Sequence, residues 1–396
     1  MCLLLAPAAL AQTDTQGGPD PSVVRVRLGP LWLNPTIDLT NLGVDTNVFN
    51  DPPDANPKHD FTLTVVPKTQ LWMRVGRTWL SGEIDEQVVW YQKYESERSA
   101  NATFAAGWKI PLNRLSFDIG AKYVTTRERP GFEIDARAQH FETSFRGKAE
   151  VRALSKTYFG VDATRLKVDY DQGTVFLGSD LRLELSHVAT TAGLTVRQQL
   201  TPLTSVTVEA SREQDRFEFS PLRDADTNSG SIAVQFDPLA LIKGRAKIGY
   251  EEFRPLVASL PGYTGVTASV DLSYVLLNTT KFVVQSTRDI QYSYDVNQPY
   301  YLQTGVSGSV TERLFGPLDV VGRAGIAHLD YRDRAGAAVT VANQLDEVQT
   351  YGAGVGYHVG PEMRIGFNID KSKRSSPVAI RRYEGLIFGT SVTYGF

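Results

Sequence analysis

Apolar residues alternate with small or polar residues at the end of the chain, residues 383–396. Counting back in twos from the terminal aromatic gives a nearly unbroken apolar set: Phe396, Tyr394, Val392, Thr390, Phe388 and Leu386. The residues between them are small or polar, except for Ile387. Because successive side chains of a strand point to opposite faces, this pattern predicts a strand with one apolar face and one hydrated face.

The same period of two recurs along most of the chain, in segments of about a dozen residues. About 18 such segments begin near residues 31, 60, 78, 98, 113, 138, 155, 181, 203, 226, 240, 262, 279, 300, 317, 346, 362 and 382. Short connections, such as Gly76-Arg77, alternate with long ones, such as residues 50–59. This alternation is typical of outer-membrane barrels, which have tight periplasmic turns and longer outer loops. We therefore expect an all-β chain, a transmembrane antiparallel up-and-down β-barrel of about 18 strands over residues 31–396.

Charged residues recur on one face of the expected strands. Between Leu115 and Tyr123, for example, apolar residues alternate with a set that includes Asp118 and Lys122. Several charges on one face would be very costly in a dry core, but they suit a water-filled lumen. We therefore predict a pore lined by Arg114, Asp118, Lys122, Glu209, Asp271, Arg323 and Arg364.

Aromatic residues lie near the ends of several expected strands. Trp32, Trp79 and Trp108 fall near the short-turn ends, and Trp90 and Tyr94 fall near a long-loop end. Membrane barrels carry aromatic girdles at both lipid boundaries, so we expect these side chains to mark the two boundaries.

Composition narrows the class of protein further. The chain has 396 residues, of which 21% are charged, and no stretch approaches the roughly 18 apolar residues that a membrane helix needs. A formal net charge of −3 argues against nucleic acid as a partner. Cys2 is the only cysteine, and none of the five histidines forms a metal-binding motif, so we expect no cofactor and no metal site.

The two termini suggest export and membrane assembly. Residues 1–11 resemble the end of a signal peptide without its basic leader, and residues 12–30 look like a periplasmic lead-in. A lipoprotein acylated at Cys2 is the alternative. The aromatic ending resembles the final strand of bacterial outer-membrane barrels, so Phe396 and Tyr394 are the expected signal for the barrel-assembly machinery. We expect an integral protein in contact with the lipid of the outer membrane of a Gram-negative bacterium.

Other motifs have structural and functional interpretations. The run Gly352-x-Gly354-x-Gly356 lies in an alternating segment and favours a lumen-facing row over a nucleotide loop. His328 and Asp330 share a face, but such pairs arise often by chance, so an enzyme is disfavoured. The loop segments 127–133 and 216–223 mix aromatics with both charges, and they could fold into the lumen, contact a polymer or remain solvated.

Two short elements near the amino terminus resemble a known family. The chain reads Gly29-Pro30-Leu31-Trp32-Leu33-Asn34-Pro35 and then Asp45-Thr46-Asn47-Val48-Phe49. These elements resemble the amino-terminal strand of the family called putative beta-barrel porin 2. The resemblance implies a barrel associated with exopolysaccharide secretion, with a periplasmic polysaccharide-export protein as partner. It transfers no functional residue, because the matched motif is structural.

The favoured function is therefore a channel for a hydrophilic solute, as an exopolysaccharide-secretion porin. The alternatives are a general diffusion porin and a structural or adhesive surface barrel that transports nothing. Large adhesive displays usually need longer loops than those expected here.

Overall fold

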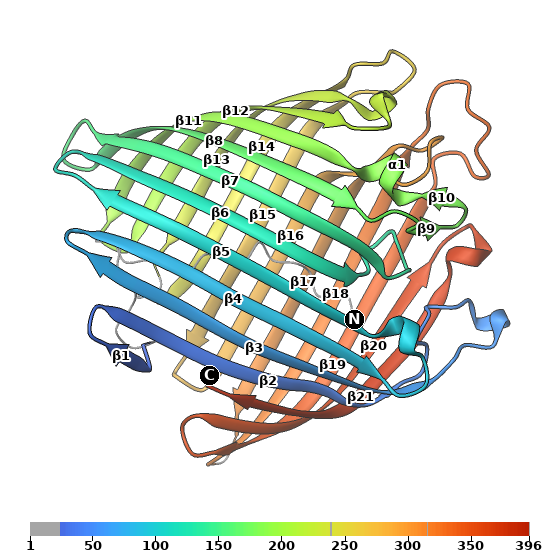
Figure 1. Ribbon diagram of the computed structural model, residues 1–396, viewed down its shortest axis with the longest axis horizontal. Coiled ribbons are helices and arrows are strands. Elements are labelled where there is room, and N and C mark those ends of the chain that lie inside the picture. Colours follow the sequence, from blue (N-terminus) through green and yellow to red (C-terminus); the bar gives the residue numbers. More distant parts are fainter. Residues whose placement is uncertain (1–23, 238–239, 315, 396) are drawn as a thin grey trace.

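Eighteen long strands form a closed antiparallel barrel in the computed structural model (Figure 1). The structure describes residues 24–237, 240–314 and 316–395. The barrel strands are β2 (Leu31–Asp45), β3 (Asp60–Val75), β4 (Thr78–Tyr91), β5 (Ser99–Pro111), β6 (Leu115–Glu128), β7 (Ala138–Arg152), β8 (Thr157–Tyr170), β11 (His187–Thr201), β12 (Thr204–Phe217), β13 (Ala225–Phe236), β14 (Ile242–Pro255), β15 (Tyr263–Leu276), β16 (Thr280–Tyr292), β17 (Tyr300–Arg313), β18 (Leu318–Arg332), β19 (Leu345–Val359), β20 (Met363–Ser375) and β21 (Tyr383–Tyr394). The predicted fold class and strand number are confirmed.

The first and last barrel strands close the sheet. Strand β2 pairs with β3 on one side and with β21 on the other, and both pairings are antiparallel. Closure leaves no open edge, which matters because an unpaired backbone group in lipid costs several kcal/mol. No helix among the described residues is both long enough and apolar enough to cross a membrane.

The connections alternate in length as the sequence predicts. One end of the barrel carries tight turns, such as Gly76-Arg77 between β3 and β4. Gly76 has a φ of 60°, a backbone conformation that glycine adopts without strain. The other end carries longer loops, such as residues 333–344 between β18 and β19. We call these two ends the turn end and the loop end.

The strand expected near residue 181 begins only at His187. Leu181–Leu185 instead forms the short helix α1, whose N-cap Asp180 accepts a hydrogen bond from the backbone of Arg182. Leu181 and Leu185 lie one helical turn apart and are both buried. The alternation of leucine with polar residues here imitates a strand, but the capped turn buries two of the leucines on one side. The short strands β9 (Val175–Phe176) and β10 (Ser179–Asp180) precede the helix.

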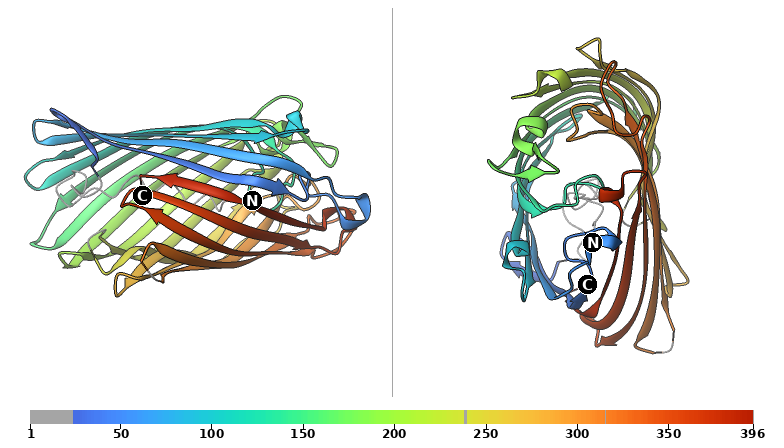
Figure 2. Two further views of the ribbon diagram at one scale, coloured as in Figure 1. Left: turned by 90° about the horizontal axis from the view of Figure 1, so that it is seen from below. Right: turned by 90° about the vertical axis from the view of Figure 1, so that its right-hand side faces the viewer.

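The two faces of the wall differ in chemistry. Large apolar side chains on one face are strongly exposed, as Leu194 (64%), Ile248 (59%) and Tyr250 (60%) show. The alternate residues on the opposite face are mostly polar. Seen from the loop end, the wall surrounds an elongated lumen into which loops extend (Figure 2, right). An apolar outer face with a polar inner face is the arrangement that a membrane barrel requires.

The amino-terminal segment adds a short strand at the turn end. Strand β1 (Val26–Leu28) folds back on β2, with Arg27 opposite Trp32. The described part of the expected lead-in is therefore partly a strand. The proposed signal peptide, Cys2 and Phe396 lie outside the described residues. Tyr394 ends β21 and is 48% exposed.

Two of the expected girdle tryptophans face the lumen instead of lipid. Trp32 pairs directly with Trp72 across β2 and β3, and the rings of Trp32 and Trp79 meet edge to face at 5.1 Å. Trp72 occupies the same face of β3 as Lys68 and is 1% exposed. The girdle prediction is therefore wrong for Trp32 and Trp79. It relied on their position near a strand end, which does not determine which face of the wall they occupy. Trp108, at 44% exposure, does lie on the outer face.

The motif at residues 45–49 fastens the closure of the barrel at its loop end. The Asn47 side chain donates to the backbone oxygen of Glu384 at 3.0 Å, which joins the start of the first loop to β21. It also donates to the Asp51 oxygen at 2.9 Å. The Asp45 carboxylate accepts from the Asn47 backbone and from the Tyr91 hydroxyl. The resemblance thus rests partly on residues that hold the first and last strands together.

Replacing Asn47 with alanine should weaken this closure. The side chain is 2% exposed, and its loss removes two partly buried hydrogen bonds to backbone oxygens, each of which contributes about 0.5–1.5 kcal/mol. We expect the folded form on an unboiled denaturing gel to convert to the unfolded form at a lower temperature. Asp54→Ala, a change in the same loop at an exposed residue, is the control and should leave that temperature unchanged. Equal shifts for both variants would contradict the assigned role.

Candidate channel lining and constriction

Ion pairs connect neighbouring strands along the inner wall. Asp118 of β6 pairs with Arg146 of β7 at 3.0 Å. Arg323 of β18 reaches across β19 to Asp370 of β20, with a nitrogen–oxygen distance of 2.9 Å. Such pairing reduces the net charge that these parts of the wall present to the lumen.

Arg364 belongs to a second ion-pair cluster near the turn end. Its guanidinium donates two hydrogen bonds to Asp319, at 2.6 and 2.7 Å, and His358 contacts the same carboxylate at 2.7 Å. Asp319 is 2% exposed. Removing Arg364 would leave the buried Asp319 carboxylate with only His358 of these two partners. Arg364 therefore stabilises the wall as well as facing the lumen.

The remaining predicted pore residues differ in their position and in their polar contacts. Glu209 lies 3.5 Å from Lys247 and 3.7 Å from Arg245. Asp271 is exposed and accepts from Gln285 at 3.4 Å. Lys122 lies on the same face of β6 as Asp118, whereas Arg114 lies in the turn before β6 rather than in a strand. That these seven residues line a conducting pore stays a prediction.

The glycine row of β19 makes room for these ion pairs. A β-carbon built on Gly352 would lie 2.2 Å from the Asp370 carboxylate, and one on Gly356 would lie 2.3 Å from the Arg364 guanidinium. Neither glycine precedes a helix, so the structure supports the wall interpretation over the nucleotide loop. Side chains at these positions would displace the arginines that cross β19.

The loop between β6 and β7, residues 129–137, reaches across the barrel and is called the inward loop here. The carboxylate of Glu133 accepts from the Ser293 hydroxyl at 2.6 Å and from the Tyr294 backbone at 3.3 Å, both in the loop between β16 and β17. Arg129 donates to the Val48 oxygen at 2.5 Å. The inward loop thus contacts the first long loop and the loop between β16 and β17. Of the interpretations left open for residues 127–133, the structure supports entry into the lumen.

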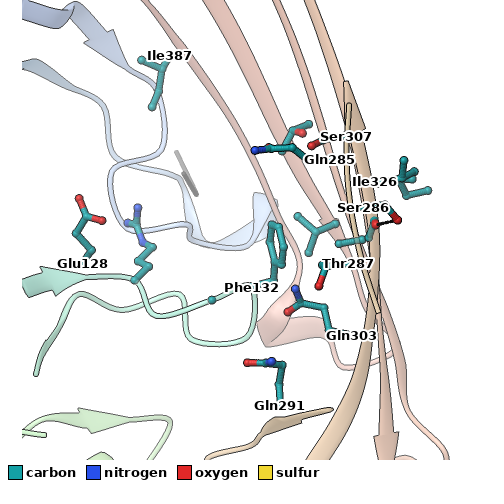
Figure 3. Close-up of a pocket in the computed structure, with 18 of the residues that line it drawn as sticks. Glu128, Phe132, Gln285, Ser286, Thr287, Gln291, Gln303, Ser307, Ile326 and Ile387 are labelled. Carbon is teal, nitrogen blue, oxygen red and sulfur yellow. Dashed lines mark hydrogen bonds between the residues drawn. The ribbon is translucent and has the colours of Figure 1, made fainter. Parts of the chain in front are cut away.

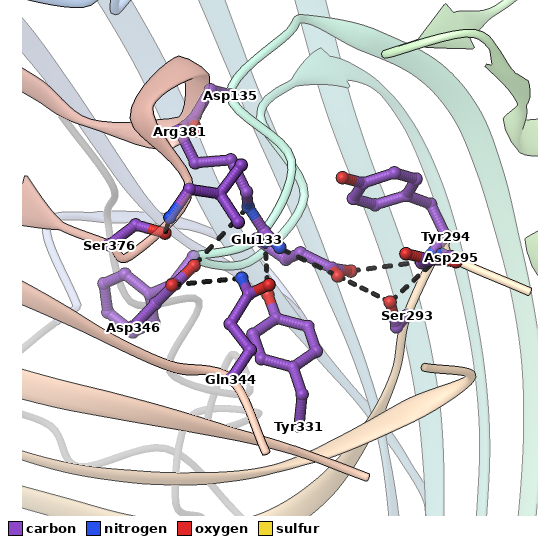
Figure 4. A network of polar contacts seen from close by, with 12 residues as sticks. Glu133, Asp135, Ser293, Tyr294, Asp295, Tyr331, Gln344, Asp346, Ser376 and Arg381 are labelled. Atoms are coloured by element: carbon purple, nitrogen blue, oxygen red, sulfur yellow. Dashed lines mark hydrogen bonds and ion pairs between the residues drawn. The ribbon is translucent and has the colours of Figure 1, made fainter. Parts of the chain in front are cut away.

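Two buried arginines hold the inward loop in place (Figure 4). Arg374 of β20 is 1% exposed and donates to the backbone oxygens of Phe132 and Glu133 at 3.1 and 2.9 Å. Its guanidinium also forms ion pairs with Asp135 at 2.8 Å and with Asp346 of β19 at 2.5 Å. Arg381 follows β20 and lies 3.7 Å from the Glu133 carboxylate. A segment held by so many charge-assisted bonds has one preferred position.

Burial raises the pKa of Glu133 above its usual range, although Arg381 and the Ser293 hydroxyl act in the opposite direction. Burial also raises the pKa of Asp135, against the effect of Arg374. A carboxyl group with a raised pKa in the folded state stabilises that state most below its ordinary pKa. This contribution is lost as the pH rises through the raised value.

The inward loop should therefore be held more firmly in acid. We expect fewer transient openings in single-channel records at about pH 5 than at about pH 8. Replacing Glu133 with glutamine should weaken this pH dependence, because the amide cannot ionise. More frequent openings in acid, in the wild type, would contradict the assignment.

The inward loop borders a cavity of about 420 Å³ (Figure 3). Phe132 projects from the loop toward the opposite wall, where Gln285 and Thr287 of β16 and Gln303 of β17 point into the cavity. Asp271 also lines it, which places one of the predicted pore residues beside the constriction. The other six predicted residues do not border this cavity.

The other chemical candidates have structural partners. His328 contacts Glu347 at 3.0 Å and Asp330 pairs with Arg332 at 2.7 Å, so the two residues do not act on each other. In segment 216–223, Arg223 is 1% exposed and donates to the Ser293 oxygen. Among the described residues, no group of three or more metal-binding side chains is placed to hold an ion.

Sequence reasoning missed the arginines that fix the inward loop. Arg374 and Arg381 lie in a basic run at the expected last loop, which looks like an ordinary solvated segment. The sequence contains one indirect indication of this contact. Glu133 and Asp135 lie in one expected loop, and basic residues of opposite charge lie in another. No local period shows that two loops so far apart in sequence meet inside the barrel.

Comparison with known proteins gives one family match. The family model described as putative beta-barrel porin 2 matches residues 22–396. No curated protein matches the chain.

Solved outer-membrane barrels are similar only at a distance. A BenF-like porin from Pseudomonas fluorescens Pf-5 is 10% identical with a TM-score of 0.48, over 93% of this chain and 100% of that one. OccK2 (OpdF) from Pseudomonas aeruginosa is 8% identical with a TM-score of 0.47, over 92% and 96%. A bacterial polysaccharide outer membrane secretin is 11% identical with a TM-score of 0.33, over 91% and 98%. These scores are too low to support an argument about function.

Proposed function

Because the chain belongs to the putative beta-barrel porin 2 family, as an integral barrel of the Gram-negative outer membrane, we propose that it conducts a secreted polysaccharide. The observation that carries the proposal is the cavity between the inward loop and the wall, which Asp271 and several uncharged polar side chains border. Barrels of 16 to 18 strands enclose an aqueous channel unless loops fill it, and the inward loop narrows this one. The resemblance of residues 29–49 to barrels associated with exopolysaccharide secretion favours a glycan as cargo.

A general diffusion porin is the second candidate, since a loop that narrows a polar lumen also suits passage of small solutes. The two functions differ in what limits passage. A conduit for chains should pass a linear molecule of any length whose cross-section fits the constriction. A diffusion porin should admit solutes up to a limiting size. An adhesive surface barrel should show no transport in either assay.

The discriminating experiment compares linear and cyclic glucans in vesicles that contain the refolded protein. Fluorescent linear malto-oligosaccharides and β-cyclodextrin of similar mass are enclosed, and their release is followed over time. We expect release of the linear chains, including long ones, and retention of the cyclic molecule. Release that falls with mass alone, regardless of shape, would favour the diffusion porin. Retention of every sugar would contradict transport.

The finer role also includes a partner. The resemblance implies a periplasmic polysaccharide-export protein, which would meet the turn end of the barrel. Residues of that end, with β1 beside the end of β21, form the surface on which such contact would occur. Assembly through Phe396 and Tyr394 by the barrel-assembly machinery likewise stays a prediction.

A further inference from the structure

Uncharged polar side chains border the cavity on the wall opposite Phe132. Five of them come from two adjacent strands, β16 and β17: Gln285, Thr287, Gln291, Gln303 and Ser307. Within the described part of the chain, the side chains of Thr287, Gln291, Gln303 and Ser307 have no hydrogen-bond partner. Several polar groups elsewhere on the inner wall are joined in ion pairs, such as Arg323–Asp370. This wall therefore presents several donors and acceptors that are free to bind a molecule in the cavity.

Phe132 supplies an apolar surface on the facing side. One part of its side chain packs against the buried cluster of Tyr301, Leu329, Tyr331 and Val348, which fixes its position. The side chain remains partly exposed and borders the cavity. The Arg374 bond to its backbone oxygen restrains it further. A rigid aromatic surface opposite amides and hydroxyls is complementary to a sugar, which has apolar C–H faces and a rim of hydroxyl groups.

The charges around the cavity disfavour an anionic ligand. Two acidic residues lie on or beside this wall. Asp271 borders the cavity 3.4 Å from the Gln285 amide, and Asp289 is the cross-strand neighbour of Gln303. The arginines on the loop side have other partners. Arg129 donates to the Asp135 and Val48 oxygens, and Arg137 pairs with Glu97 at 3.2 Å. A carboxylated or sulfated sugar would therefore meet Asp271, which has no ion pair among the described residues, while both described arginines that line the cavity are engaged elsewhere.

We propose that this cavity binds a unit of an uncharged sugar chain, with Phe132 against one face of the ring and the side chains of β16 and β17 on its hydroxyl groups. The volume of about 420 Å³ lies within the range of small-molecule sites, roughly 300–1,000 Å³. The proposal rests on the proposed function and adds the charge class of the cargo. It makes the constriction a selective site rather than a simple narrowing.

The test records single-channel current in planar bilayers, with maltohexaose as a neutral chain and hexagalacturonate as an anionic chain of the same length. In the wild type, maltohexaose should interrupt the current at lower concentration than hexagalacturonate. Phe132→Leu keeps an apolar side chain but removes the aromatic face. The double change Gln285→Met with Gln303→Met keeps side-chain length but removes two amides. Each should weaken the interruption by maltohexaose about tenfold, which corresponds to about 1.4 kcal/mol.

The matched control is Phe219→Leu, at a phenylalanine that is 41% exposed in the loop between β12 and β13 and does not border the cavity. It should behave as the wild type. Heat-modifiable migration first shows that each variant is folded. Interruption by maltohexaose that is unchanged in both site variants, or tighter interruption by hexagalacturonate, would overturn the binding site. A conducting protein that released no sugar from vesicles would overturn the proposed function instead.

Discussion

Replacing Arg374 with alanine is expected to free the inward loop and to destabilise the folded protein by about 3–5 kcal/mol. Arg374 joins Asp346 of β19 to Asp135 of the loop, and it also donates to two loop carbonyl oxygens. Asp346 is fully buried, so loss of the arginine leaves its charge with only Arg381 at 3.4 Å and the Gln344 amide at 3.1 Å as described partners. The free-energy cost of this buried charge falls if the loop leaves its position and admits water. The variant should therefore combine a less stable barrel with a wider channel.

Two measurements follow the released loop. Thermolysin, which cleaves before large apolar residues, should cut at Phe132 or Ile134 in the variant much faster than in the wild type. Single-channel conductance should rise. Arg382→Ala is the matched control, because Arg382 is exposed and bonds only within its own loop, to the Ser376 and Pro377 oxygens. Unchanged cleavage and conductance in the Arg374 variant would show that other contacts hold the loop.

Neighbouring arginine substitutions on the two faces of β16 should have opposite outcomes. Val284 is 47% exposed on the outer face, while Gln285 borders the cavity beside Asp271. An arginine near the middle of the lipid-facing band costs about 2–4 kcal/mol, whereas a lumen residue can be charged with little effect on folding. Val284→Arg should therefore yield little assembled barrel. Gln285→Arg should assemble and shift ion preference toward anions.

This pair is its own control, because both variants place the same residue at adjacent positions of one strand. Assembly is read from heat-modifiable migration, and ion preference from the reversal potential in a salt gradient. Assembly of both variants in equal yield would mean that Val284 does not meet lipid. Failure of both would mean that the assigned lumen position does not tolerate a charge.

The sequence predicts the barrel well because its signals are local. Period-two alternation identifies a strand such as β6 from its own residues, and a turn such as Gly76-Arg77 is short wherever the strands lie. Errors occur where two structures share one pattern. Leu181 and Leu185 fit a strand and a capped helical turn equally well, and Trp32 near a strand end fits the lipid boundary or the lumen.

The constriction is not predictable in this way because it depends on contacts between distant segments. Glu133 and Ser293 are separated by 160 residues, and Arg374 and Asp135 by 239. A loop with mixed charges can be solvated or fold inward, and the choice depends on whether partners of opposite charge meet it in space. The part of the wall that β16 and β17 contribute to the cavity is equally hard to predict from the sequence. Its glutamines and serines look like ordinary polar strand positions until the position of Phe132 is known.

The central claim, a water-filled lumen behind a lipid-facing wall, is tested most directly at adjacent positions of β15. Single cysteines replace Asp271 and Leu272 in a Cys2→Ser background, and the assembled protein is treated with a membrane-impermeant, water-soluble maleimide. We expect rapid labelling at position 271, which borders the cavity, and protection at position 272 by lipid. Labelling at position 272 with protection at 271, or equal protection at both, would contradict the water-filled channel and the polysaccharide passage inferred from it.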